Sequence, residues 1–127
     1  MEGKLVYEYA VIRVVPRVER EEFINVGIIV FCKTKDFIEV SIAIPEQRLM
    51  AFVDSDKLGE IKQHLSSFEN IAKGDEAAGP IAALPVPERF RWLTATRSTV
   101  VQSSRIHSGL CTQPEGIAAH LMAQMVL

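Results

Sequence analysis

A dense cluster of charges runs directly into a continuous apolar stretch between residues 17 and 32. Residues 25–32 are too apolar to lie at a surface, yet they begin with Asn25 and contain Gly27. Glycine weakens a strand unless another backbone must come close at that position. We therefore expect a buried strand over 25–32, with a close backbone approach at Gly27 and a polar side chain held inside at Asn25.

The chain is long enough to build one hydrophobic core, because a domain of 127 residues buries roughly two-thirds of the surface its unfolded chain exposes. We expect a single α+β domain over residues 1–127. Apolar residues make up 48% and charged residues 24%, with a net charge of −2. These values are typical of soluble globular proteins and argue against a chain built mainly to coat nucleic acid.

The compartment follows from three further features of the sequence. Acids near the N-terminus are unlike a signal peptide, and no apolar run reaches the length of a membrane helix. The two cysteines, Cys32 and Cys111, do not resemble a disulfide framework. We therefore expect reduced thiols, a cytoplasmic location and no membrane association.

Three early segments predict a β-meander. Residues 5–15 carry apolar side chains on both faces, as a central strand does, with Arg13 as an unusual polar exception. Residues 25–32 form the second strand, and a short polar turn leads into a third over 37–44. In that third strand the core-facing residues are Ile38, Val40, Ile42 and Ile44.

Helices dominate the rest of the chain. A short helix over 46–53 precedes a longer one that Asp54 or Ser55 caps and Gly74 ends. The remaining elements are a loop over 74–87, a helical turn over 88–93, a strand over 99–104 and a helix over 114–127. This order predicts an α+β fold, with an antiparallel sheet of about four strands and helices packed on one face.

Basic charge gathers late in the chain, where residues 85–113 hold four arginines against one acid. The guanidinium fork binds carboxylate or phosphate through two parallel hydrogen bonds. The segment 96–99, with Arg97 beside hydroxyl groups, therefore suggests an anion site. The alternative is structural: Arg89 and Arg91 pair with surface glutamates such as Glu22 or Glu88, and Arg97 makes an ion pair within the scaffold.

Four stretches carry a resemblance to a known family. They are Tyr-Glu-Tyr-Ala-Val-Ile-Arg-Val-Val-Pro over 7–16, Arg-Glu-Glu-Phe-Ile-Asn-Val-Gly-Ile-Ile-Val-Phe over 20–31, Arg-Phe-Arg-Trp-Leu-Thr-Ala-Thr-Arg-Ser-Thr over 89–99 and His-Ser-Gly-Leu-Cys over 107–111. Together they resemble the bacterial family known as domain of unknown function 3037, over nearly the whole chain. The resemblance implies a small cytoplasmic protein encoded beside a HipA-like kinase, its implied partner, and no particular reaction. The positions it draws attention to are Arg13, Arg20, Glu21, Asn25, Gly27, Arg97, Ser98, Thr99, His107 and Gly109.

The first hypothesis is a binding or regulatory module whose anion or partner site joins Arg13 and Asn25 to the Arg97-Ser98 turn and His107. Its motivation is the polar residues at strand positions together with the local excess of arginine. We assign Arg20, Glu21 and Thr99 to the same binding set. Whether the protein is also an enzyme stays open.

Other hypotheses use the same residues differently. A small hydrolase or nuclease would combine His107 with Glu21 or Cys111. A nucleic-acid-binding module would use Tyr7, Tyr9 and Trp92 as stacking surfaces. In a third alternative the signature residues stabilise only the fold or a homodimer.

Cofactor and metal sites lack sequence support. Cys32, Cys111, His107 and His120 show no paired ligand spacing. The glycines form no nucleotide-binding fingerprint. We therefore predict neither a metal nor a cofactor.

Overall fold

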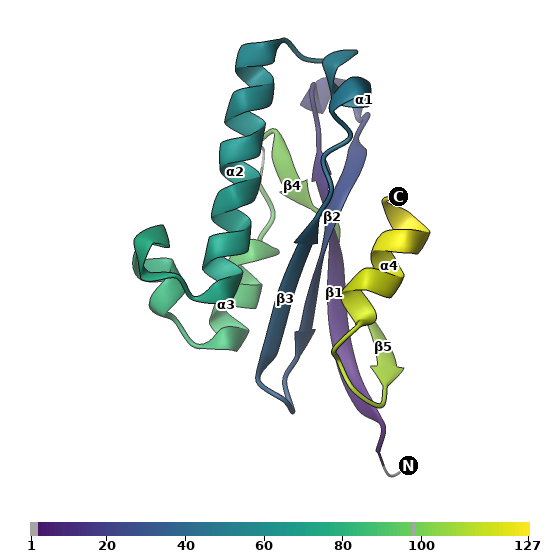
Figure 1. Cartoon of the computed structure of the whole chain (residues 1–127), viewed down its shortest axis with the longest axis vertical. Helices are drawn as coiled ribbons and strands as arrows, with labels where there is room; N and C mark the ends of the chain where they lie inside the picture. Colours follow the sequence, from purple (N-terminus) through teal and green to yellow (C-terminus); the bar gives the residue numbers. More distant parts are fainter. Residues whose placement is uncertain (1–2, 98) are drawn as a thin grey trace.

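The α+β architecture is confirmed in a computed structural model of the chain, which describes residues 3–97 and 99–127. Its centre is an antiparallel sheet (Figure 1). The first three strands are β1 (Leu5–Val14), β2 (Ile24–Cys32) and β3 (Phe37–Ile42). They pair in the order β3-β2-β1, so the predicted meander is present.

Two short strands complete the sheet beside β1. Strand β4 (Val101–Ser103) pairs with the end of β1, and β5 (His107–Cys111) pairs with its beginning. The sheet therefore has five strands, one more than expected, because β5 was not predicted. Its Ser and Gly content hides it, since neither residue is typical of strands.

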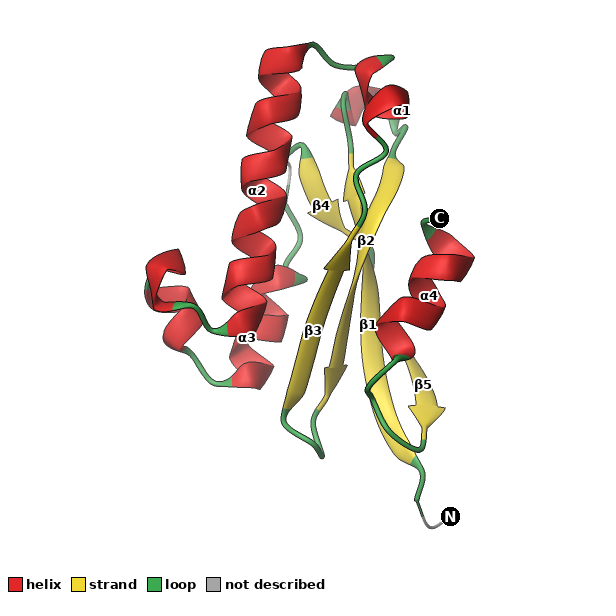
Figure 2. Cartoon of the chain, in the orientation of Figure 1, coloured by secondary structure: helices red, strands yellow, loops and turns green. Residues whose placement is uncertain are grey.

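Helices lie on both faces of the sheet (Figure 2), which corrects the expectation of helices on one face. Helix α1 (Glu46–Met50), the long α2 (Ser55–Lys73) and α3 (Val86–Leu93) cover one face. Helix α4 (Ile117–Met125) covers part of the other. Between α2 and α3, where a loop was expected, the chain forms two 3-10 turns, Glu76–Ala78 and Pro80–Ala83.

The larger core, called the α2-side core, lies between the sheet and helices α1, α2 and α3. The apolar stripe of α2, which runs from Leu58 to Ala72 at helical spacing, is buried in it, with Phe68 only 2% exposed. Phe31 of β2 stacks on Phe90 of α3 with ring centroids 4.8 Å apart. Asp54 caps α2 by accepting a hydrogen bond from the backbone N–H of Lys57, and Gly74 ends it in the left-handed conformation.

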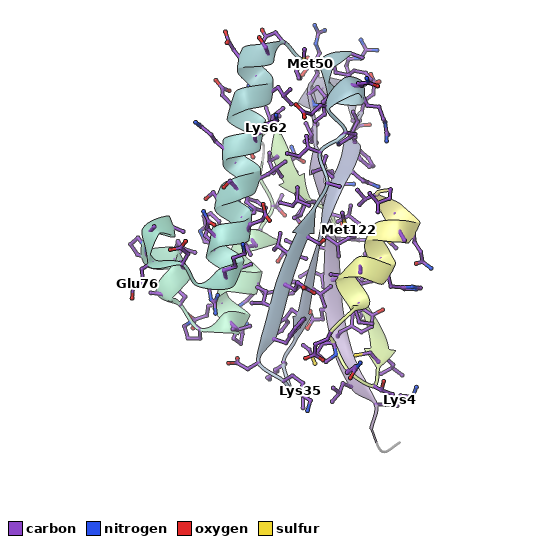
Figure 3. All side chains as sticks on the ribbon, in the orientation of Figure 1. Lys4, Lys35, Met50, Lys62, Glu76 and Met122 are labelled. Atoms are coloured by element: carbon purple, nitrogen blue, oxygen red, sulfur yellow. The ribbon has the colours of Figure 1, made fainter. Side chains whose placement is uncertain are left out.

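The smaller core, called the α4-side core, lies between α4 and the opposite face of the sheet. It joins Val11, Ile28 and Val30 to Leu121 and Met122 of α4. Figure 3 labels Met122 on this helix. The apolar residues on both faces of β1 are the sequence signal for this second layer, because a strand buried on both sides needs two covers.

Candidate functional site

The alternation of β2 is interrupted at Gly27. Ile12 of β1 pairs with Gly27 and Arg13 pairs with Asn25, so Val26 has no partner on β1. Such a bulge bends the strand and puts two successive residues on one side. A Cβ at Gly27 would lie 2.7 Å from the Ser41 carbonyl oxygen and 3.2 Å from Cδ1 of Ile12. The close backbone approach expected from the sequence is therefore present.

Beyond the bulge, three polar residues face the α4 side in one row across the sheet. Arg13 of β1 has Asn25 of β2 on one side and Gln102 of β4 on the other. Asn25 donates from Nδ2 to the carbonyl oxygen of Met125 in α4, at 3.1 Å. Gln102 donates from Nε2 to the carbonyl oxygen of Thr99, at 2.8 Å. Both carboxamides are thus fixed by backbone carbonyls, whereas Arg13 is not.

Arg13 has an aromatic neighbour and no acidic one. Its Cζ lies 4.2 Å from the ring centroid of Phe23, a cation–π contact. Among the described residues, no ion pair or hydrogen bond of its guanidinium is present. The side chain borders an open depression of about 300 Å³, lined by Arg13, Val15, Glu21, Phe23 and Gln102. We call this the Arg13 site.

Asn25 contributes a second polar anomaly beside Arg13. Its Oδ1 is buried without a hydrogen-bond partner among the described residues. A buried acceptor without a donor costs about 1–3 kcal/mol. Asn25 therefore destabilises the fold through its unpaired Oδ1 and connects α4 to the sheet through its Nδ2.

The charged connection between β1 and β2 forms the rim of this region. Glu21, which lines the Arg13 site, adopts a positive φ of 55°, a conformation uncommon for residues other than glycine. Arg20 donates from Nε to Oε1 of Glu22 at 2.6 Å, in an exposed pair that contributes little stability. Arg20 borders a different depression, lined by Pro16, Arg17, Arg20, Glu22, Ala51 and Phe52.

Arg97 lies on the other face of the sheet. Its Nη1 donates to the carbonyl oxygen of Leu93 at 3.0 Å, and its Nη2 donates to that of Trp92. Its Cζ lies over the rings of Trp92 and Phe68, at 4.4 Å and 5.5 Å from their centroids. Burial lowers the pKa of the Arg97 guanidinium from its ordinary value. The side chain closes the C-terminal end of α3, where cations are favoured.

Arg89 serves the same kind of purpose for α2. It donates from Nη1 to the carbonyl oxygens of Ile71 and Ala72, at 3.0 Å and 2.8 Å, and from Nε to that of Leu84 at 2.9 Å. Among the described residues, neither Arg89 nor Arg97 makes an ion pair. Both have structural contacts, as the alternative expected, but their acceptors are backbone carbonyls and not glutamates. The late arginine cluster consists in part of helix-end caps.

The remaining predicted residues are also dispersed. Ser98 lies outside the described residues. Thr99 donates its hydroxyl to the carbonyl oxygen of Val101 at 2.8 Å and borders a depression beside α2. His107, in β5, pairs with Tyr9 and stacks on its ring at a centroid distance of 5.3 Å. The ring of Tyr7 crosses Gly109, where an added Cβ would meet it at 2.6 Å.

The composite site expected from the sequence therefore does not form. Asn25 contacts α4 on one face of the sheet, and Arg97 contacts Phe68 of α2 on the other. His107 shares the face of Arg13, but it pairs with Tyr9, four residues away along β1, which corresponds to about 13 Å at the usual strand rise. Of the predicted residues that the structure describes, only Arg13, Glu21 and Asn25 come together, and Phe23 and Gln102 join them unpredicted.

The residues required by the hydrolase hypothesis are also too far apart to act together. His107 and Cys111 lie four residues apart on β5, so at about 3.3 Å per residue they are too far apart for a hydrogen bond. Burial, with Cys32 and Glu115 nearby, raises the pKa of the Cys111 thiol, which opposes thiolate formation. Glu21 belongs to the distant Arg13 site.

The stacking surfaces required for nucleic-acid binding are also divided. Tyr7 and Tyr9 are half-buried beside the α4-side core. The pKa of Tyr7 is raised mainly by burial and, to a smaller extent, by the neighbouring Tyr9 and Cys111. Trp92 lies in α3 under Arg97. In the described part of the chain, no three His, Cys, Asp or Glu residues cluster as metal ligands. No described helix is long and apolar enough to cross a membrane.

Comparison with known proteins places the chain in one family. The family described as protein of unknown function (DUF3037) matches residues 9–126. The match spans nearly the entire sequence, so the chain belongs to this family. No curated protein and no solved structure matches the chain significantly.

Proposed function

We propose that this member of the DUF3037 family is a binding module and that the Arg13 site is where it holds an anionic group of its partner. The observation that carries the proposal is Arg13 itself. Its guanidinium lies on the ring of Phe23 and beside an open depression, and none of the described acids pairs with it. Charged side chains are seldom drawn into a sheet without a partner, and Arg13 is partly buried.

The chemistry of the ligand follows from the guanidinium. Its planar fork suits carboxylate and phosphate, to which it donates two parallel hydrogen bonds. The ring of Phe23 restricts the guanidinium plane, and the fixed carboxamides of Asn25 and Gln102 flank Arg13 on the neighbouring strands. A ligand therefore meets a partly preorganised donor, which lowers the entropy cost of binding.

Glu21 sets a condition on the ligand. Glu21 lines the same depression as Arg13, and a like charge near a bound anion weakens binding. A purely anionic ligand should therefore bind more tightly to Glu21→Gln. A segment that carries a cation next to its anion should instead lose affinity in that variant.

The depression suits a side chain of a protein better than a whole metabolite. It holds about 300 Å³ and is open to solvent, at the lower limit of pockets that enclose small molecules. The family resemblance implies a HipA-like kinase as the partner, and this kinase is the first protein to test. The two buried free thiols suit a reducing compartment, so we expect binding to take place in the cytoplasm.

The experiment measures binding of the purified protein to a HipA-like kinase, the partner that the family resemblance implies, by co-purification and calorimetry. Arg13→Ala should weaken binding at least tenfold, because one charge-assisted pair contributes about 1.5–3 kcal/mol. Arg91→Ala, an exposed arginine of α3, is the matched control and should bind as the wild type does. Equal affinity of all three proteins for the kinase overturns the kinase as the ligand of this site.

A second arm tests the site without any partner. Inorganic phosphate is titrated while NMR follows the Nε–H resonance of Arg13. The proposal requires this resonance to shift in the wild type and the remaining spectrum of Arg13→Ala to stay unchanged. If neither phosphate nor acetate moves the Arg13 resonance, the Arg13 site is not an anion site.

A further inference from the structure

The two edges of the sheet are protected to different extents. At one edge, β3 carries Glu39 and packs against α2, and the β2–β3 turn holds charges that include Lys35 (Figure 3). At the other edge, β5 contains His, Ser, Gly, Leu and Cys. It has neither the charge nor the proline that natural proteins place on exposed edges.

Strand β5 pairs only with β1 within the described chain. Figure 1 shows it beside the beginning of β1, and α4 packs mainly on β2 and β3, away from the β5 edge. The outer backbone groups of β5 therefore have no strand partner among the described residues. Such a row of donors and acceptors is a template for a further strand.

Apolar side chains are exposed on and beside the same strand. Leu110 of β5 is 66% exposed and pairs with Val6 of β1, which is 58% exposed. Both point to the α2 side of the sheet, where the first half of β1 extends beyond the helices. Ile106, just before β5, is 43% exposed. The Glu8–Ser108 pair lies between Ile106 and the Val6–Leu110 pair, so the apolar surface at this edge consists of Val6 and Leu110.

We propose that β5 pairs antiparallel with β5 of a second copy of this chain, so that one sheet continues through both subunits. With Gly109 at the twofold axis, all five residues pair, and Leu110 lies opposite Ser108 of the second copy. The diagonal places the two Leu110 side chains about 7–8 Å apart on one face, within reach of each other. Together with both Val6 side chains they form a shared apolar cluster.

A second copy fits this edge because the strand is self-complementary. It carries no charged residue, so two copies meet without like charges opposite each other. An isologous contact also covers the exposed Leu110–Val6 pair with an identical pair. The contact is small, so the dimer should be in equilibrium with the monomer and depend on protein concentration.

The arrangement has a consequence for the Arg13 site. A twofold axis normal to a continuous sheet keeps the same face of both subunits on one side. The two Arg13 sites then lie on the same side of the dimer, which favours a partner with two binding segments. The pairing itself does not depend on what the Arg13 site binds.

Sedimentation equilibrium over a range of protein concentrations tests the pairing. The wild type should shift from monomer to dimer as the concentration rises. Leu110→Lys should stay monomeric, because it places two like charges diagonally across the axis. Phe52→Lys is the matched control, since Phe52 is 54% exposed and lies outside β5, and it should dimerise as the wild type does.

Charge rescue tests the partner strand directly. Leu110→Lys mixed with Leu110→Glu should form a heterodimer, while each variant alone stays monomeric, because opposite charges now meet. Circular dichroism melts must first show that both variants are folded. A wild type that is monomeric at its highest soluble concentration, or a Leu110→Lys variant that dimerises normally, overturns the proposal. Neither result alters the kinase or phosphate titration of Arg13→Ala.

Discussion

On the α2 side of the sheet, Arg89 and Arg97 donate to backbone carbonyls at the ends of two helices. On the α4 side, Arg13 lies one residue before the end of β1, and its guanidinium makes a cation–π contact with Phe23 but no hydrogen bond or ion pair among the described residues. Arginine side chains thus support helix ends on one face, whereas on the other face the Arg13 guanidinium has no hydrogen-bond acceptor among the described residues. The difference teaches that a local excess of arginine does not by itself mean free donors, because backbone carbonyls at helix ends accept hydrogen bonds from Arg89 and Arg97.

The largest expected effect concerns how tightly the α2 side is packed. Gly27→Val should lower the free energy of unfolding by about 3 kcal/mol or more, since backbone and core atoms must shift to admit the side chain. The added Cβ would lie 2.7 Å from a backbone oxygen and 3.0 Å from Cγ1 of Ile42. Urea denaturation measures the loss.

Gly59→Ala is the control for this measurement. Gly59 lies within α2 and an added Cβ meets nothing within 4 Å. Alanine there should stabilise the protein by up to about 1 kcal/mol, because it favours the helix. A Gly27→Val protein as stable as the wild type contradicts the close approach of β2 and β3.

The next effect separates the two kinds of arginine. Arg89→Ala removes three hydrogen bonds to the carbonyls of Leu84, Ile71 and Ala72, and should cost about 2 kcal/mol of stability. Arg13→Ala removes one exposed cation–π contact and should cost less than about 1 kcal/mol. Thermal melts of both variants compare them. If Arg13→Ala is the more damaging change, Arg13 belongs to the scaffold and the contrast between the faces fails.

The smallest effect concerns the tie between the sheet and α4. Asn25→Ala loses the hydrogen bond to Met125 but also removes the buried Oδ1 that lacks a donor. The two terms have opposite signs, so stability should change by less than about 1 kcal/mol. Urea denaturation measures the change. A loss as large as that of Arg89→Ala shows instead that Asn25 is the main anchor of α4.

Much of the fold is local and could be predicted. The apolar runs of β1, β2 and β3, the stripe of α2, its Asp54 cap and its Gly74 terminus all follow from residue types and their spacing. Gly27 could be interpreted in advance because a glycine within a buried strand has few explanations. Strand β5 could not be predicted because the space beside Gly109 is occupied by the ring of Tyr7 from the neighbouring strand, a contact that the local sequence does not show.

The site was only half predictable for a related reason. Arg13 and Asn25 stand out because they interrupt apolar strands, and Glu21 lies in the connection between those strands. Nothing in the local sequence shows that Gln102 pairs with Arg13. Arg97 was misassigned because its hydroxyl-rich neighbourhood resembles an anion site, while the carbonyls it caps belong to the helix just before it.

The sequence by itself determined the secondary structure of the meander and of α2, because periodicity, caps and glycines act over a few residues. Only the tertiary structure decided which face each helix covers, where β5 joins the sheet and which arginine has N–H groups that no described backbone carbonyl accepts from. Those outcomes depend on strand register and on helix ends that distant segments bring together. Hydrogen bonds to backbone carbonyls form wherever such ends arrive, and no residue type in the sequence announces where that is.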